Sequence, residues 1–103
     1  MANIADNKFY MSWDFGYDIS PTLNQIAELF DELEGGYISY ETPNFIEGGF
    51  SSKWAFPFSF WNEILKDKPI YFRCLTEEYG MGVVSMNIHN KDGTWRESQY
   101  FDL

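Results

Sequence analysis

Carboxylates are the abundant reactive groups of this sequence, which has 16 Asp and Glu residues against 7 Lys and Arg. Paired carboxylates can cleave glycosides by acid and base catalysis, and clustered carboxylates can bind a divalent cation. Glu77 and Glu78 are adjacent at the end of an expected strand, so their side chains should point to opposite faces. The sequence carries no calcium-loop pattern. A small carboxylate-based enzyme therefore stays open only as an alternative.

The sequence has one cysteine and one histidine, Cys74 and His89, too few for a structural zinc site. Cys74 alternates with Ile70 and Phe72 along an expected strand, so we expect it to pack as a small hydrophobic residue. His89 lies beside a turn and is expected at the surface. Gly80-Met81-Gly82 lacks the helix that would follow a phosphate-binding loop. We therefore predict a non-enzymatic protein with no catalytic residue, no cofactor and no metal.

The net charge of −9 is unevenly distributed along the chain. Residues 1–50 hold nine acidic side chains and one basic one, Lys8, which gives −8, whereas residues 51–103 contribute only −1. An acidic surface disfavours direct nucleic-acid binding, because phosphate contacts require basic side chains. The same surface attracts a basic partner.

A helix predicted to follow Pro21 carries the densest acidic cluster. Its run from Glu28 to Glu34 spans about 9 Å of helix axis, a length over which duplex DNA carries about five charges. Mimicry of nucleic acid is one interpretation, and an ordinary solvated helix face is the other. The candidate partner-binding residues are Asp14, Asp18, Glu28, Asp31, Glu32, Glu34, Glu41, Glu47, Glu77, Glu78 and Tyr79.

Hydrophobic periodicity predicts the elements that position these residues. Residues 1–7 are expected to be a loose lead-in, and the alternation over residues 8–17 indicates a strand. Asp18, Ser20 and Pro21 are typical of a helix start. The helix should end at Gly35-Gly36. Its inward face is predicted to hold Leu23, Ile26, Ala27, Phe30 and Leu33.

The remaining pattern predicts five further strands and one further helix. A short helix should follow Pro57, with Phe58, Trp61, Ile64 and Leu65 facing inward. The strands are expected at residues 37–41, 45–53 (with a bulge or bend at Gly48-Gly49), 70–77, 81–89 and 94–101. The order β-α-β-β-α-β-β-β predicts a single α+β domain over residues 1–103, with an antiparallel sheet and two helices on one face. The first six elements have ferredoxin-like order, and a C-terminal hairpin is added to them.

Three motifs resemble those of the YubB-like family of ferredoxin-like domains, which occurs on plasmids and phages. They are the run from Phe50 to Pro57, the segment Tyr71-Phe72-Arg73, and the acidic and glycine-containing turn over residues 77–82. The resemblance covers residues 50–93. It implies a ferredoxin-like fold and an origin in a mobile element, and it implies no particular chemistry.

Charge and resemblance together suggest a phage or plasmid inhibitor of a host nucleic-acid-handling or defence complex, similar to an anti-CRISPR protein. It would act by blocking a basic nucleic-acid-binding surface of a host protein or nucleoprotein complex. The sequence shows no leader pattern and no membrane segment, so we expect the host cytoplasm. Two alternatives stay open. An unpaired strand edge would allow a homodimer, and exposed rings would bind a partner; those rings are Tyr10, Tyr37, Tyr40, Trp54, Tyr79 and Trp95.

Overall fold

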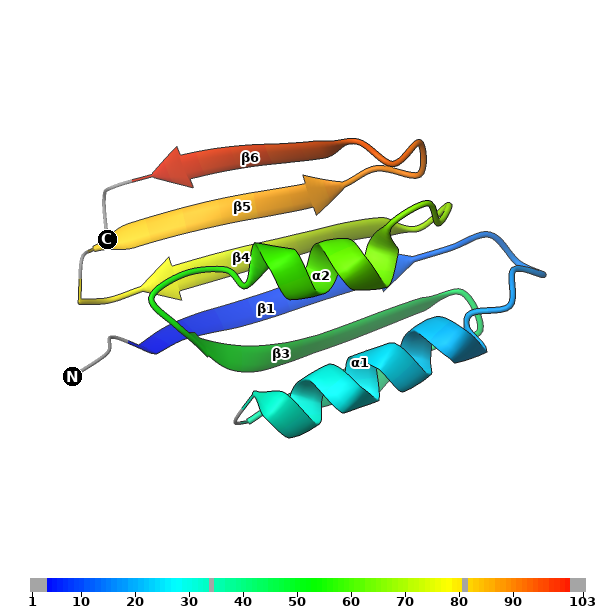
Figure 1. Ribbon diagram of the computed structural model, residues 1–103, viewed down its shortest axis with the longest axis horizontal. Coiled ribbons are helices and arrows are strands. Elements are labelled where there is room, and N and C mark those ends of the chain that lie inside the picture. Colours follow the sequence, from blue (N-terminus) through cyan, green and yellow to red (C-terminus); the bar gives the residue numbers. More distant parts are fainter. Residues whose placement is uncertain (1–3, 34, 81, 101–103) are drawn as a thin grey trace.

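The described residues of the chain form one antiparallel sheet of six strands, with two helices on one of its faces (Figure 1). The computed structural model describes residues 4–33, 35–80 and 82–100. The strands lie in the order β2-β3-β1-β4-β5-β6. The predicted α+β fold with two helices on one sheet face is confirmed. In chain order the elements are β1 (Ile4–Ser12), α1 (Ser20–Glu32), β2 (Tyr37–Glu41), β3 (Phe45–Lys53), α2 (Phe58–Leu65), β4 (Tyr71–Glu78), β5 (Val83–His89) and β6 (Trp95–Tyr100).

The bounds of β1 differ from the prediction at both ends. The strand begins at Ile4 rather than Lys8, so the expected loose lead-in is wrong for residues 4–7, and residues 1–3 lie outside the described chain. The first residues of the strand that face the core are Ala5 and Asn7. Because they are small or polar, the sequence shows no apolar alternation there. The strand stops at Ser12 because the chain then turns. Within that turn the Tyr17 amide donates to the Asp14 carbonyl, and Gly16 has φ 90°.

Helix α1 begins as the sequence indicates but buries a slightly different face. The Asp18 carboxylate accepts a hydrogen bond from the Ser20 amide at 3.1 Å, and Pro21 lies in the first turn. The buried side chains are those of Thr22, Ile26 and Leu29. Ala27, predicted to face inward, is exposed. Leu23, Phe30 and Leu33 pack against the core as predicted. The prediction missed Thr22 because it is polar; its hydroxyl is buried as the acceptor of a hydrogen bond from Lys68 Nζ.

The predicted bounds of the later elements are close to the observed ones. Strands β2 and β3 match their predictions, β4 is shifted by one residue, and β5 and β6 begin at Val83 and Trp95. Met81 and Phe101, which the predicted strands included, lie outside the described residues. Helix α2 buries Trp61, Ile64 and Leu65 as predicted, whereas Phe58 stays 45% exposed. The irregularity expected at Gly48-Gly49 lies in the neighbouring strand β2, between Ile38 and Tyr40.

Aromatic rings fill the space between the helices and the sheet. The ring of Phe9, on the central strand β1, lies 5.3 Å from the ring of Trp61 and 6.0 Å from that of Phe72. Trp61 stacks on Phe72 at 4.5 Å. Such ring pairs add stabilisation beyond the area they bury. This cluster fixes α2 against β1 and β4.

His89 is buried, which contradicts the predicted surface position. Its side chain is 1% exposed, and Nδ1 lies 2.7 Å from the Ile70 carbonyl oxygen. The ring of Trp95 packs edge to face against the imidazole at 5.1 Å. The Ile70 carbonyl is 19 residues away in sequence, so the local pattern around His89 does not reveal this contact. Trp95 lies opposite His89 in the β5–β6 hairpin, and the sequence predicts its ring to be exposed rather than packed on the imidazole.

Candidate functional site

Four exposed carboxylates lie on the outer side of the helix layer. Helix α1 presents Glu28, Asp31 and Glu32, and α2 contributes Glu63, which sequence reasoning did not single out. Glu28, Glu32 and Glu63 line a hollow of about 350 Å³ between the two helices. We call these four residues the acidic helix surface.

The carboxylates of the acidic helix surface form no ion pair with any basic side chain that the structure describes. Within the described residues the structure has a single ion pair, which joins Lys91 Nζ to Asp14 Oδ1 at 2.6 Å. Lys68 lies near α1 but donates to the neutral side chains of Thr22 and Gln25. Partial burial also lowers the pKa of the Lys68 ammonium. The carboxylates of this surface are therefore available to bind a cationic group from another molecule.

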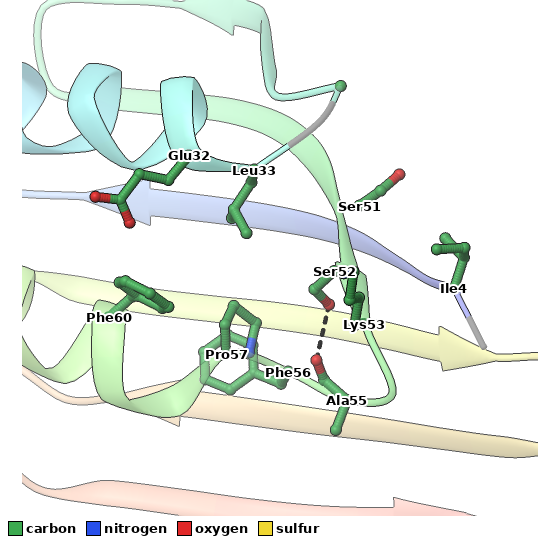
Figure 2. A pocket seen from close by; sticks show the side chains of 11 residues that line it. Ile4, Glu32, Leu33, Ser51, Ser52, Lys53, Ala55, Phe56, Pro57 and Phe60 are labelled. Carbon is green, nitrogen blue, oxygen red and sulfur yellow. Dashed lines mark hydrogen bonds between the residues drawn. The ribbon is translucent and has the colours of Figure 1, made fainter. Parts of the chain in front are cut away.

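A second, larger hollow continues from the acidic helix surface (Figure 2). It has a volume of about 670 Å³ and lies between the C-terminal end of α1 and the connection from β3 to α2. Glu32 and Phe60 line both hollows, so together they form one interhelical groove. The lining of the larger hollow is mostly apolar, with Leu33, Phe56, Pro57 and Phe60. Its polar contacts include a hydrogen bond from Ser52 Oγ to the Ala55 carbonyl at 2.7 Å.

The interhelical groove combines two kinds of chemistry that suit a protein partner. Its carboxylates can bind ammonium or guanidinium groups, and its apolar lining can bury the methylene stems that carry such groups. Lys53 gives the far end of the groove one positive charge. A basic segment with some apolar surface fits this arrangement.

Several predicted acidic residues lie away from the acidic helix surface. Asp14 and Asp18 are exposed in the loop between β1 and α1, where Asp14 is paired with Lys91 and Asp18 accepts a hydrogen bond from the Ser20 amide. Glu41 lies at the other flank of α1, beside Ile38 and Ile46. Glu47 faces the opposite side of the sheet. Glu34 lies outside the described residues.

Glu77, Glu78 and Tyr79 divide between the two faces of the sheet, as the sequence predicts for the adjacent glutamates. Glu77 accepts a hydrogen bond from the Tyr79 hydroxyl at 2.6 Å, and this bond raises the pKa of Tyr79. Glu78 is only 3% exposed and accepts from the Gly80 amide at 2.9 Å. We therefore exclude Glu78 from any partner-binding surface, because its carboxylate holds the turn that follows β4.

Aromatic rings run across the sheet face that no helix covers, which we call the open face. The ring of Phe45 lies between those of Tyr40, at 5.6 Å, and Tyr10, at 5.5 Å. Tyr71 continues the row at 6.2 Å from Tyr10, and the Arg73 guanidinium lies 4.6 Å above the Tyr10 ring. Trp95, expected to be an exposed ring, is instead half-buried on the helix side against Phe58 and His89.

The remaining groups with reactive chemistry are enclosed. Cys74 packs in the core as predicted, and burial raises the pKa of its thiol to about 12. A thiol with that pKa stays protonated at neutral pH and is a weak nucleophile. The described part of the chain contains no group of three or more His, Cys, Asp or Glu side chains placed to hold a metal ion. Among the same residues, no helix is long and apolar enough to cross a membrane.

No protein-family model, no curated protein and no solved structure matches the chain. The resemblance to the YubB-like family therefore rests on the sequence motifs alone. The site is defined by the geometry of the acidic helix surface, the interhelical groove and the open face.

Proposed function

We propose that this protein is a non-enzymatic inhibitor that binds a basic nucleic-acid-binding surface of a host complex. The proposal includes an origin in a phage or plasmid and an action similar to that of an anti-CRISPR protein. The observation that carries it is the acidic helix surface, where four exposed carboxylates have no ion-pair partner within the described residues. A basic partner would supply the missing cations.

The spacing of the acids on α1 supports mimicry of a phosphate backbone. Glu28 and Glu32 are separated by about 6 Å along the helix axis, with Asp31 between them in sequence. Duplex DNA carries about three to four charges over that length. Glu63 adds a fourth carboxylate across the groove. The charge density is therefore comparable to that of the ligand the target normally binds.

The apolar part of the interhelical groove supports a protein target. Lys and Arg side chains have methylene stems that gain by lying against Phe60 and Leu33. Nucleic acid itself lacks such apolar surface at its phosphates. The groove would therefore give the inhibitor affinity beyond its charge.

A ferredoxin-like core for the first six elements is part of the same proposal. Their order β-α-β-β-α-β and the sheet order β2-β3-β1-β4 support it. Strands β5 and β6 then form an added hairpin next to β4. This fold places both helices, and so both sources of acid, on the same face.

The test is displacement of DNA from a purified CRISPR effector complex, measured by mobility shift. We expect the wild-type chain to displace DNA, with an effect that falls steeply between about 50 and 200 mM salt. The combined variant Glu28→Gln, Asp31→Asn, Glu32→Gln, Glu63→Gln should lose at least about tenfold in inhibition. Full inhibition by this variant would contradict the proposal.

A matched control separates the acidic helix surface from net charge. The combined variant Asp14→Asn, Glu41→Gln, Glu47→Gln, Glu97→Gln also removes four charges, at residues outside this surface. It should inhibit nearly as well as the wild type. An equal loss in both variants would show that net charge alone acts.

A further inference from the structure

The open face of the sheet differs from the helix side in both charge and composition. Its charged side chains on β1, β3, β4 and β6 are three acids and four bases, a net charge of about zero to +1: Asp6, Glu47 and Glu77 against Lys8, Arg73, Arg96 and, at the end of β3 beside the groove, Lys53. Its remaining residues are mostly aromatic and aliphatic, with Ser12, Ser51 and Ser98 among them. Tyr, Phe, Met and Arg are the residues enriched at the centres of protein interfaces. A face without net negative charge, on a chain of charge −9, does not fit the basic partner of the helix side.

The register of β4 and β5 makes this face self-complementary. On β4 the open face carries Glu77, Leu75 and Arg73 in a row. On β5, Val84 pairs with Glu77, Met86 with Leu75, and Ile88 with Arg73. The β4 row therefore has an acid at one end, an apolar residue at its centre and a base at the other end. The neighbouring β5 row consists of three apolar residues.

From this arrangement we propose that two copies of the chain pack face to face through their open faces. The twofold axis crosses the strands above Leu75 and Met86. Rotation about it brings Glu77 of each copy against Arg73 of the other, and Val84 of each copy against Ile88 of the other. Leu75 and Met86 meet their own counterparts at the centre. The inference does not depend on the function proposed for the helix side.

The two charged groups are available for such pairing. Neither Arg73 nor Glu77 has an ion-pair partner among the described residues. The Arg73 guanidinium is held above the Tyr10 ring, and Glu77 accepts one hydrogen bond from Tyr79. A carboxylate has further acceptor sites, so Glu77 can also bind a guanidinium. Lys8 pairs with Leu75 and so lies close to the twofold axis. Its flexible side chain lets the ammonium group turn away from the axis, toward Asp6 and Glu77.

The area of the open face is adequate for a dimer. Five strand spacings of about 4.8 Å, and about seven residues at about 3.4 Å each, give a flat area near 570 Å² on each copy. Projecting side chains raise the accessible area above this value. The area of the two copies together therefore exceeds the total of about 1,000 Å² that a specific interface needs. A standard interface buries about 800 Å² on each partner. Two sheets packed in this way form an aligned sandwich.

Charge reversal at Arg73 and Glu77 tests the proposal through the mass of the full chain in sedimentation equilibrium. The wild type should sediment as two chains. Arg73→Glu and Glu77→Arg should each raise the dissociation constant about 100-fold or more, because like charges then meet twice. An equimolar mixture of the two variants should restore a dimer, and so should the double variant. A monomeric wild type would overturn the proposal.

Two controls keep the result specific. Glu63→Arg, on the acidic helix surface, should leave the mass unchanged, although it should weaken inhibition of the host complex. Leu75→Lys should dissociate the dimer without relying on the ion pairs, and its circular dichroism should report whether it is folded. A dimer that persists in folded Arg73→Glu, Glu77→Arg and Leu75→Lys chains would contradict the face-to-face arrangement and favour pairing at a strand edge.

Discussion

Hydrogen bonds of one buried amide link the three central strands. Asn7 of β1 is 2% exposed, and its Nδ2 donates to Ser52 Oγ of β3 at 2.9 Å. Its Oδ1 accepts from the Thr76 hydroxyl of β4 at 2.7 Å. Buried polar groups that are fully hydrogen-bonded fix one register, because any slip would leave them unsatisfied. Asn7 therefore helps to place the open-face residues of β1, β3 and β4 opposite one another.

Cys74 lies beside this amide, and its raised pKa predicts a pH dependence of stability. In the folded chain the thiol keeps its proton up to about pH 12, whereas an unfolded thiol loses it above its ordinary pKa of 9.0. The contribution of the buried, protonated thiol to the free energy of unfolding is therefore fully present below pH 9 and is lost as the pH rises from 9 toward 12. We expect the free energy of unfolding in urea to fall by up to about 1.4 kcal/mol per pH unit in that range.

The Cys74→Ala variant provides the control for this pH dependence, because it has no thiol to titrate. The difference in unfolding free energy between wild type and variant should change only above pH 9. Parallel curves from pH 7 to 11 would show that burial of the thiol does not affect its titration.

At the scale of elements, the contact of β2 with β3 depends on Gly48. A Cβ at this position would lie 2.2 Å from the Tyr37 carbonyl oxygen and 2.9 Å from the Phe9 ring. The backbone of β2 approaches β3 closely here, opposite the irregularity between Ile38 and Tyr40. Glycine in this strand therefore serves a close approach of two backbones.

Replacing Gly48 with alanine should displace β2 from the sheet edge. We expect the free energy of unfolding to fall by about 1–3 kcal/mol, as for other overpacked positions. Amide hydrogen exchange should accelerate over residues 37–41 more than over β4. Ser51→Ala on the same strand is the control, and it should leave exchange unchanged. Equal protection of β2 in Gly48→Ala would contradict the close approach.

The types and order of the elements could be predicted from the sequence, but some buried positions could not. Apolar alternation and helical spacing identify β2, β3 and α2, because their inward residues are mostly large and apolar. The start of β1 escapes this signal, since Ala5 and Asn7 are its inward residues. Glu78 is buried although it is charged, with the Gly80 amide two residues on as a donor. His89 is buried with the Ile70 carbonyl as its partner, a contact over 19 residues that only the folded chain defines.

At the scale of the whole molecule, the sheet separates two surfaces of different charge. The acidic cluster of α1 could be predicted from sequence, because three of its members follow helical spacing. Glu63 could not, since its place beside Glu28 depends on how α2 packs against α1. The self-complementary row on the open face likewise depends on the pairing register of β4 with β5. Sequence therefore indicates the charge of the site, and the fold determines its extent.

This charge distribution predicts opposite effects of salt on stability and on inhibition. Salt screens the repulsion among Glu28, Asp31, Glu32 and Glu63, so it should raise the free energy of unfolding by a few tenths to about 1 kcal/mol. Salt should at the same time weaken the proposed inhibition of a host complex. The measurement is urea unfolding at one fixed protein concentration and at increasing salt.

The variant without these four carboxylates provides the comparison. Its unfolding free energy should depend less on salt than that of the wild type. If the unfolding free energy of this variant depended on salt as strongly as that of the wild type, the charge repulsion that salt screens would lie outside the acidic helix surface.

The indole side chains differ sharply in environment, with a spectroscopic consequence. Trp61 is fully buried, and its Nε1 has no hydrogen-bond partner in the described part of the chain, whereas Trp54 is 53% exposed. Trp54 follows Lys53 and precedes Ala55, both of which line the interhelical groove. An aqueous quencher therefore reaches Trp54 and not Trp61. The intrinsic fluorescence of the chain thus combines emission from the buried Trp13 and Trp61 and the half-buried Trp95 with emission from the exposed Trp54, and an aqueous quencher should reduce the Trp54 part first.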